Sequence, residues 1–348
     1  MTTLVKLPTS RLSADEAPGL EDRLLRFQRA KLTANFLTHT VVVFVTVFLF
    51  ASLATFALQG LSGLSPAYLL LPDSATAEQI TALEHEWGLD KPFYVQYLDW
   101  LWGILHGDLG YSWYNGASVS ELLWSRAIVS LSVAGLALVI GVVVGFALGA
   151  LAAKFQTTWI DRSITGFTTI FSVVPPFVVG ISLVSIFAVK LGWFPSAGYV
   201  SIASGGLGGW LSYLWLPALA LSFDTIADIA RQLRVGLIQA YRENWVTGAQ
   251  VRGLGSRRIF FVHVLRNAGG PALTVLGMKF PSLLGGAVIT EAIFGLAGYG
   301  QFAADSANRG DVPSVQGVLV VAVLLVVVFN LLVNFLLVRL IPAAGRGI

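Results

Sequence analysis

The chain has 348 residues, of which 55% are hydrophobic and 12% are charged, and its formal net charge is +3. A soluble domain carries about twice that share of charged residues, so the composition excludes an ordinary soluble protein and favours one that faces lipid. The absence of cysteine excludes a disulfide framework and thiol chemistry. The small positive charge gives no independent support to nucleic-acid binding, and we expect no nucleic-acid partner.

The N-terminal residues 1–35 precede the first apolar run and are predicted to form a cytoplasmic tail. Within this tail Leu20, Leu24, Phe27 and Ala30 recur at helical spacing beside arginines. Such a pattern is typical of a short helix lying in the membrane interface. A disordered basic tail explains the same residues equally well.

Apolar runs long enough to cross a lipid bilayer recur along the chain. A helix needs about 20 residues to cross about 30 Å of hydrocarbon. Four runs are free of charge before their last few residues, namely 36–58, 129–153, 165–189 and 315–340. Two weaker runs complete a set of six, namely 210–223, which extends through Ala230, and 271–294, which contains Lys279 and Glu291. Because lipid offers the backbone no hydrogen-bond partner and no alternating strand pattern is present, the sequence predicts an all-α, polytopic membrane protein with about six transmembrane helices embedded in a lipid bilayer.

The predicted division of the chain follows these runs. Residues 36–59 form the first transmembrane helix, 60–126 a small external helical cap, 127–342 a core of five helices, and 343–348 a cytoplasmic tail. The cap carries many large aromatic residues: Trp87, Tyr94, Tyr97, Trp100, Trp102, Tyr111, Trp113 and Tyr114. These residues either pack the cap against the membrane interface or form a surface that docks a partner.

Lysine and arginine are concentrated in alternate connections between the apolar runs. They gather in the N-terminal tail, in the connection after the second run and in the connection after the fourth, whereas the connection between the first two runs is acidic. Cytoplasmic loops hold the excess of these residues in membrane proteins. We therefore expect both termini to be cytoplasmic.

The sequence lacks a set of residues suited to catalysis or to holding a cofactor or metal. Its histidines, His39, His85, His106 and His263, have no paired metal-ligand spacing. There is no Gly-rich phosphate-binding loop of the Walker type. The chain is therefore predicted to be non-catalytic, and any ATP that drives it must be bound elsewhere.

Four residues inside the predicted spans are candidates for a translocation pathway. Lys279 would cost about 2.5 to 3.5 kcal/mol at the bilayer centre, so it should face the bundle interior or extend toward the cytoplasm. There it either attracts a carboxylate in a pore or forms a structural ion pair. Glu291 is expected to pair within the bundle or with the cap. Pro175 and Pro176 end or kink the third span, which forms a gate or simply shapes the helix.

Lys279 and Glu291 are the only charged groups that this interpretation places within the spans. A self-sufficient secondary transporter would need acidic relays or broken helices that coordinate ions. The interpretation therefore disfavours that class of protein.

The connection over residues 231–268 has a regular pattern of its own. Helical spacing runs through 241–251, after which Gly253 and Gly255 permit a turn. Ser256 is expected to cap a second helix that runs toward the membrane. This pattern predicts an isolated helix on the cytoplasmic side, suited to insertion into another protein; a loop lying on the membrane surface is the alternative.

This connection resembles the EAA loop of binding-protein-dependent ABC importer permeases. Thr247, Gly248 and Ala249 correspond to the opening triplet of that loop, and Gly253 to its glycine. The acidic opening residue and the final proline are absent. The small side chains would let another backbone approach closely.

Further segments are similar to the dipeptide/oligopeptide and nickel permeases, B-type subunit, over nearly all of residues 35–335. They are residues 88–110, 174–177, 192–198, 216–219 and 285–294. The chain departs from the family pattern at residues 296–300, at Asn334 and at 341–346, and it has a longer N-terminal tail.

The resemblance implies a fold of the ABC type I importer permease class and a place in the bacterial inner membrane, importing di- or oligopeptides. A sister permease would form the other half of the pathway, an external substrate-binding protein would deliver the solute, and two cytoplasmic subunits would bind ATP and Mg. The implied ATPase-coupling residues are Glu243, Thr247, Gly248, Ala249, Gly253 and Leu254. Alternatives are an importer of nickel chelates, opines or oligosaccharides, a secondary transporter, or a scaffold that transports nothing.

Overall fold

The computed structural model of the chain describes residues 41–58, 66–71 and 75–340. The regular elements in these ranges are helices, and an isolated bridge pairs Tyr111 with Ser118. The predicted all-α class is therefore confirmed. The tail 1–35 and the last residues 343–348 lie outside the described ranges. Ala51–Gly347 forms one compact unit, and every contact described below lies within it.

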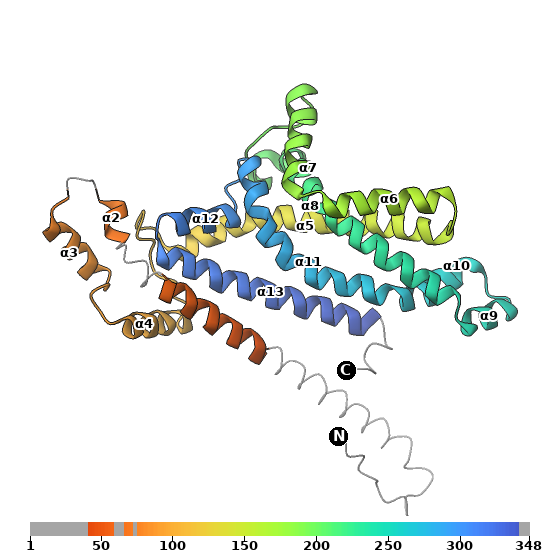
Figure 1. Cartoon of the computed structure of the whole chain (residues 1–348), viewed down its shortest axis with the longest axis horizontal. Coiled ribbons are helices and arrows are strands. Elements are labelled where there is room, and N and C mark those ends of the chain that lie inside the picture. The colour runs from red at the N-terminus through yellow and green to blue at the C-terminus, as the bar shows by residue number, and fades with distance from the viewer. Residues whose placement is uncertain (1–40, 59–65, 72–74, 341–348) are drawn as a thin grey trace, which may run out of the picture. The chain divides into compact units, whose positions relative to one another are not determined.

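The helices follow one another with short connections (Figure 1). The first is Val41–Leu58, and the predicted cap contains α2 (Pro66–Leu70), α3 (Ala77–Glu86) and α4 (Phe93–Leu105). The core contains α5 (Val119–Lys154), α6 (Trp159–Val173), α7 (Pro176–Leu183), the π-helical η1 (Val184–Lys190), α8 (Ile202–Tyr241), α9 (Asn244–Val251), α10 (Ser256–Arg258), the π-helical η2 (Ile259–Val264), α11 (Leu265–Ile293), α12 (Tyr299–Asn308) and α13 (Val312–Leu340).

Within the described residues, five helices are long and apolar enough to cross a membrane, or six if α6 and α7–η1 make one bent span. The five are Val41–Leu58, Val119–Lys154, Ile202–Tyr241, Ser256–Ile293 and Val312–Leu337. This agrees with the prediction of about six transmembrane helices. The boundaries proposed for the cap and the core remain predictions.

The fourth predicted span is much longer than expected. It ends at Phe223 or Ala230 in the sequence analysis, whereas α8 continues to Tyr241. The charged residues beyond Phe223 suggested a loop, but they are paired: Arg234 donates from Nε to Asp161 Oδ1 at 2.6 Å and from Nη2 to Asp161 Oδ2 at 2.7 Å. This two-point ion pair joins α8 to α6 and lets the helix carry its charges.

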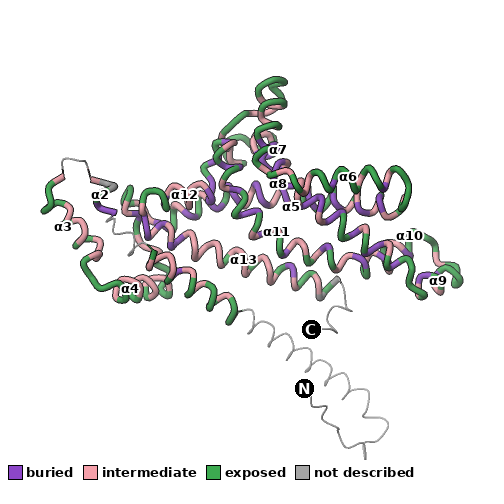
Figure 2. Tube along the Cα trace, viewed as in Figure 1, coloured by how far each residue is buried: buried purple, intermediate pink, exposed green. Residues whose placement is uncertain are grey.

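Three glycines of α5 form the contact with α8. Gly141, Gly145 and Gly149 recur every four residues and therefore lie on one face of the helix. A Cβ atom added at Gly149 would lie 2.7 Å from the carbonyl oxygen of Ala230, so the two backbones are in direct contact there. Small residues at this spacing are how membrane helices approach closely without a hydrophobic driving force. Buried residues are concentrated along this contact, as Figure 2 shows.

The third predicted span is broken at Pro175. Helix α6 ends at Val173 and α7 begins at Pro176, and the two axes differ by 100°. Val174 has the extended conformation (φ −74°, ψ 122°) that a following proline favours, and Pro176 occupies the first turn of α7, where its missing amide costs nothing. The predicted interruption is confirmed and is far larger than a kink.

The aromatic residues of the predicted cap divide between packing and exposure. Trp87 stacks on Trp113 with ring centroids 5.0 Å apart, and Tyr97 and Trp100 both pack on Phe56 of the first helix. Others lie at the surface and are half exposed or more: Tyr94, Trp102, Tyr111 and Tyr114. Some of these aromatic residues therefore support the packing hypothesis, and the exposed ones support the hypothesis of a docking surface.

Candidate functional site

The isolated helix predicted from the sequence is α9, held at one end of the core. Arg242 and Glu243 separate α9 from the end of α8 at Tyr241. The prediction of one continuous helix over residues 241–251 is therefore wrong at its start. Val246 and Ala249 are buried in a cluster with residues of α8, η2 and α11: Leu233, Leu237, Ala240, Ile259, Val264, Ala268 and Ala272. One face of α9 is thus fixed to the membrane helices on both sides of it.

The C-terminus of α9 is closed by Gly253. This glycine has a left-handed conformation, with φ +76°. Its N–H donates to the Gln250 carbonyl at 2.9 Å, and the N–H of Leu254 donates to the Ala249 carbonyl at 3.2 Å. These are the two bonds of a Schellman motif, and the accompanying apolar contact is Leu254 against the cluster that holds α9. The predicted turn at Gly253 is confirmed.

The predicted capping role of Ser256 is wrong by one residue. Gly255 occupies the N-cap position of α10, with no side-chain cap, and its carbonyl accepts the N–H of Ile259 at 3.1 Å. Ser256 is therefore the first helical residue. Glycine is also a favourable N-cap residue, so the adjacent Gly255 and Ser256 were both candidates for this position.

The opposite face of α9 is open. Glu243 and Thr247 are exposed, Gly248 has no atom within 4 Å of where a Cβ would lie, and Val251 is 83% exposed. Ala249, by contrast, points into the core and is 3% exposed. The predicted coupling residues therefore fall on two faces, and Ala249 anchors the helix. Val251 was not among the predicted coupling residues, although an apolar residue between the polar Gln250 and Arg252 was an available signal.

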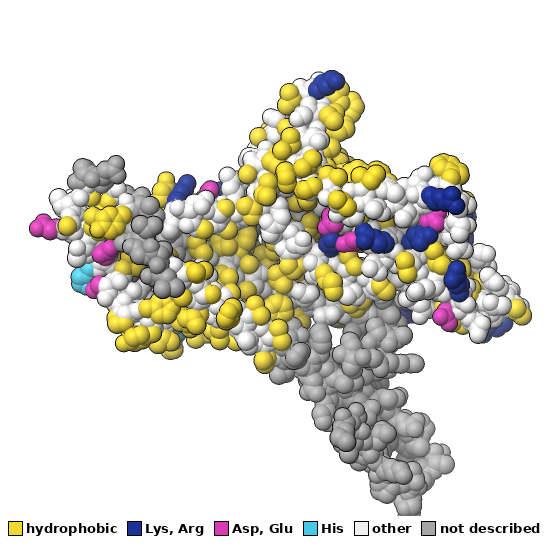
Figure 3. Space-filling view, in the orientation of Figure 1, with side chains coloured by type: hydrophobic (Ala, Val, Ile, Leu, Met, Phe, Trp, Pro, Cys, Tyr) yellow, Lys and Arg dark blue, Asp and Glu magenta, His cyan; other side chains and the backbone are white. Residues whose placement is uncertain are grey.

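A cluster of ion pairs joins α8 to α11 near the middle of the core. Lys279 Nζ lies 2.5 Å from Asp224 Oδ2 and 2.6 Å from Asp228 Oδ2. Arg231 Nη2 lies 3.3 Å from Asp228 Oδ1. Figure 3 shows side chains of both signs following one another in a row across this face of the core. The four charges balance, which lowers the cost of holding them among apolar helices.

Neither carboxylate of this ion-pair cluster was predicted from the sequence. Only Lys279 and Glu291 were expected within the spans, and Asp224 and Asp228 on α8 correct this expectation. Their spacing of four residues, which puts them on one helical face, was the available signal. The side chains of Asp224 and Asp228 are 36% and 28% exposed. Charged side chains within membrane-spanning helices seldom face hydrocarbon, so we expect this face of α8 and α11 to meet water or another protein.

Glu291 lies elsewhere and is fully enclosed. Its Oε1 accepts from the hydroxyl of Ser130, and its Oε2 accepts from the backbone N–H of Gln301 at 2.7 Å. The Ser130 hydroxyl in turn accepts from the N–H of Tyr299 at 2.7 Å. The residue is 1% exposed and ties α5, α11 and α12 together. The prediction that Glu291 pairs within the bundle is confirmed, and no open surface adjoins it.

The sequence matches a family of membrane transport components. Residues 141–346 match the family described as the binding-protein-dependent transport system inner membrane component, and residues 33–134 match its N-terminal membrane component. The chain belongs to this family. It is thus a multi-pass inner-membrane permease of a binding-protein-dependent ABC transporter, and such permeases are non-catalytic. The alternatives of a secondary transporter and of a scaffold are excluded by this assignment.

Relatives of this permease support the same conclusion. It is 35% identical over 298 residues to the probable peptide ABC transporter permease y4tP of Sinorhizobium fredii, covering 86% of this chain and 94% of the relative. It is 30% identical over 306 residues to the oligopeptide permease AppB of Bacillus subtilis, covering 87% and 96%. It is 32% identical over 308 residues to the glutathione permease GsiC of Salmonella choleraesuis, covering 87% and 94%.

The fold of this permease also resembles a solved ABC transporter. A structure of the inward-facing MetNI methionine ABC transporter superposes with a TM-score of 0.50 and 17% identity, covering 63% of this chain and 96% of that one. At this identity the likeness supports the fold alone. It agrees with the permease fold that the sequence predicted.

Proposed function

We propose that this permease forms half of the translocation pathway of an importer for di- or oligopeptides. Its relatives at 30% to 35% identity are named as permeases for peptides, oligopeptides and glutathione. The ion-pair cluster adds a physical argument, because its exposed carboxylates and its ammonium group suit a substrate with a charge of each sign at its ends. Lys279 and its two partners would line the pathway, with Pro175 and Pro176 shaping the helix beside it.

The coupling of this pathway to ATP is proposed to pass through α9. The observation that supports it is the two-sidedness of that helix: Val246 and Ala249 are buried against α8 and α11, whereas Thr247 and Val251 are exposed. A partner that binds the exposed face of such a helix and moves it would also displace the membrane helices packed against its buried face. Glu243 precedes α9, where a negative charge favours the helix N-terminus.

The proposal includes three kinds of partner. A sister permease would complete the pathway, two cytoplasmic ATP-binding subunits would receive α9 and its counterpart, and an external binding protein would deliver the solute to the cap. ATP and Mg would be bound by the ATPase subunits. Both termini would be cytoplasmic, as the distribution of lysine and arginine predicts.

The proposal is tested by ATP hydrolysis in the complex that co-purifies with this permease under gentle solubilisation. The binding protein is added with peptides, nickel chelates, opines or oligosaccharides in separate reactions. We expect peptides to stimulate hydrolysis and the other solutes to leave it at the basal rate. Stimulation by one of the other solutes alone would replace the peptide assignment, and the absence of any associated ATPase would refute coupling through α9.

A further inference from the structure

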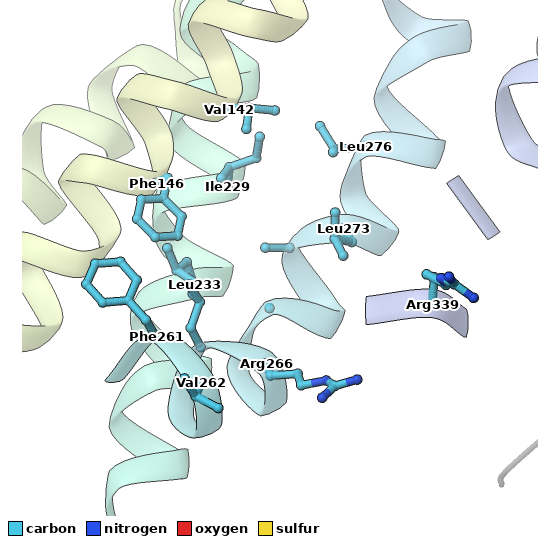
Figure 4. Close-up of a pocket in the computed structure, with 13 residues that line it drawn as sticks. Val142, Phe146, Ile229, Leu233, Phe261, Val262, Arg266, Leu273, Leu276 and Arg339 are labelled. Atoms are coloured by element: carbon cyan, nitrogen blue, oxygen red, sulfur yellow. The ribbon is translucent and has the colours of Figure 1, made fainter. Parts of the chain in front are cut away.

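An apolar cavity of about 440 Å³ lies between α5, α8, η2, α11 and α13, in the half of the core nearest α9. Its walls are aliphatic and aromatic, and include Phe146, Leu233 and Leu273 (Figure 4). The volume lies within the range of about 300 to 1,000 Å³ that is usual for ligand pockets. A cavity with such walls suits a hydrocarbon chain rather than a polar solute.

Two arginines interrupt the apolar lining. Arg266 stands in the first turn of α11, and Arg339 in the last turn of α13. Figure 4 shows their guanidinium groups on the same side of the cavity, beyond the apolar side chains. The other eleven lining residues carry no charge. The cavity therefore offers an apolar interior with two positive charges at one edge.

This combination matches an anionic amphiphile. Guanidinium groups pair with phosphate through two parallel hydrogen bonds, and basic pockets between membrane helices at the cytoplasmic side are sites for anionic lipid headgroups. The predicted orientation places these helix ends at the cytoplasmic surface, where anionic lipids are available. We infer that the cavity holds an acyl chain of an anionic phospholipid, with Arg266 and Arg339 at its phosphate.

The position of the cavity gives the lipid a consequence for coupling. Leu233 lines the cavity and also belongs to the cluster in which Val246 and Ala249 of α9 are buried. Phe146 packs against the same cluster. Helix α8 precedes α9 in the chain and α11 follows it, so an acyl chain between them would limit how closely these two helices approach. Anionic lipid would thereby set how firmly α9 is joined to the pathway.

Two variants separate the head and the tail of the lipid. Arg266→Gln with Arg339→Gln removes the charges and keeps the cavity, and Arg162→Gln is its control because Arg162 is exposed on α6 and lines no part of the cavity. Gly269→Leu fills the cavity and keeps both arginines. A Cβ at Gly269 meets no atom within 4 Å, so the larger residue enters open space.

The measurement is lipid retention by the purified complex. Complexes are reconstituted in vesicles of phosphatidylcholine with phosphatidylglycerol, extracted, and weighed by native mass spectrometry. The wild type and Arg162→Gln should retain phosphatidylglycerol in preference to phosphatidylcholine. The double glutamine variant should lose that preference by roughly 25-fold, from two arginines each contributing about a fivefold effect. Gly269→Leu should lose both lipids.

Each contrary result overturns the inference. Retention of phosphatidylglycerol by the double variant at the level of the control would remove the role of the arginines. Unchanged retention by Gly269→Leu would place the lipid outside the cavity. Displacement of the headgroup by inorganic phosphate, with no loss on filling the cavity, would make this a site for a free anion. Loss of the sister permease from both variants, with lipid retention unchanged, would assign the cavity to a contact between subunits.

Discussion

Val251 is the residue at which docking of α9 can be tested with a small change. It is 83% exposed on the open face of the helix, and it would be buried if α9 enters a groove of the ATPase. Val251→Ala removes about two methyl-sized groups, each contributing about 0.8 kcal/mol on burial. Scaled by the exposed fraction, the loss is about 1.3 kcal/mol, or about a ninefold weaker association with the ATPase.

The assay is the dissociation constant of the ATPase subunit for the permease pair in lipid nanodiscs, together with substrate-stimulated hydrolysis. Val189→Ala is the matched control, because Val189 is 73% exposed in η1 and lies on a different element. The control should bind the ATPase as the wild type does. If Val251→Ala and Val189→Ala bound it equally well, α9 would not present this face to the ATPase.

Three further predictions concern the helix contacts. Lys279→Gln removes the ammonium group from Asp224 and leaves Asp228 with Arg231, and it should lower stability by about 2 kcal/mol, since the cluster is partly exposed. Adding Asp224→Asn should restore part of the loss in a thermal unfolding assay, and no recovery would mean that Lys279 and Asp224 are not coupled. Gly149→Ala should destabilise the permease by about 1 to 3 kcal/mol, because the added methyl group would clash with the α8 backbone. In the control Gly135→Ala on the same helix, the added methyl group meets no atom within 4 Å, so this change should be neutral or stabilising. Equal melting temperatures of the two variants would refute the close contact. Arg234→Lys keeps the charge but loses one of two hydrogen bonds to α6, so the melting temperature should fall, and an unchanged value would show that the geometry of the guanidinium is not needed.

The sequence was sufficient for the class of protein and for the C-terminal end of α9. Runs of about 20 apolar residues have few interpretations in lipid, and glycine at residue 253 has the conformational freedom that the turn requires. Pro175 likewise breaks its helix for a purely local reason. These features depend on neighbouring residues in the chain, and local physical chemistry decides them.

The contacts between helices were not accessible in the same way. Whether Asp224 faces Lys279 depends on how α8 and α11 are rotated about their axes, and a single sequence does not contain that rotation. The same applies to Ala249, which the resemblance placed at the ATPase and the structure places in the core. The glycines of α5 were visible at their regular spacing, but their partner helix was not.

The 100° bend between α6 and α7 bears on whether the chain crosses the bilayer an even or an odd number of times before α9. If that bent pair counts as one crossing, the chain passes the bilayer an even number of times, and α9 emerges on the side of the N-terminus. If the pair entered and left through the same leaflet, every later connection would be inverted and α9 would point away from any cytoplasmic ATPase. The break at Pro175 and Pro176 thus bears on which side of the membrane α9 is available to an ATPase. Reporter tags inserted in residues 155–158 and 191–201 should therefore be found on opposite sides of the membrane, and tags on the same side would show that the pair enters and leaves through one leaflet.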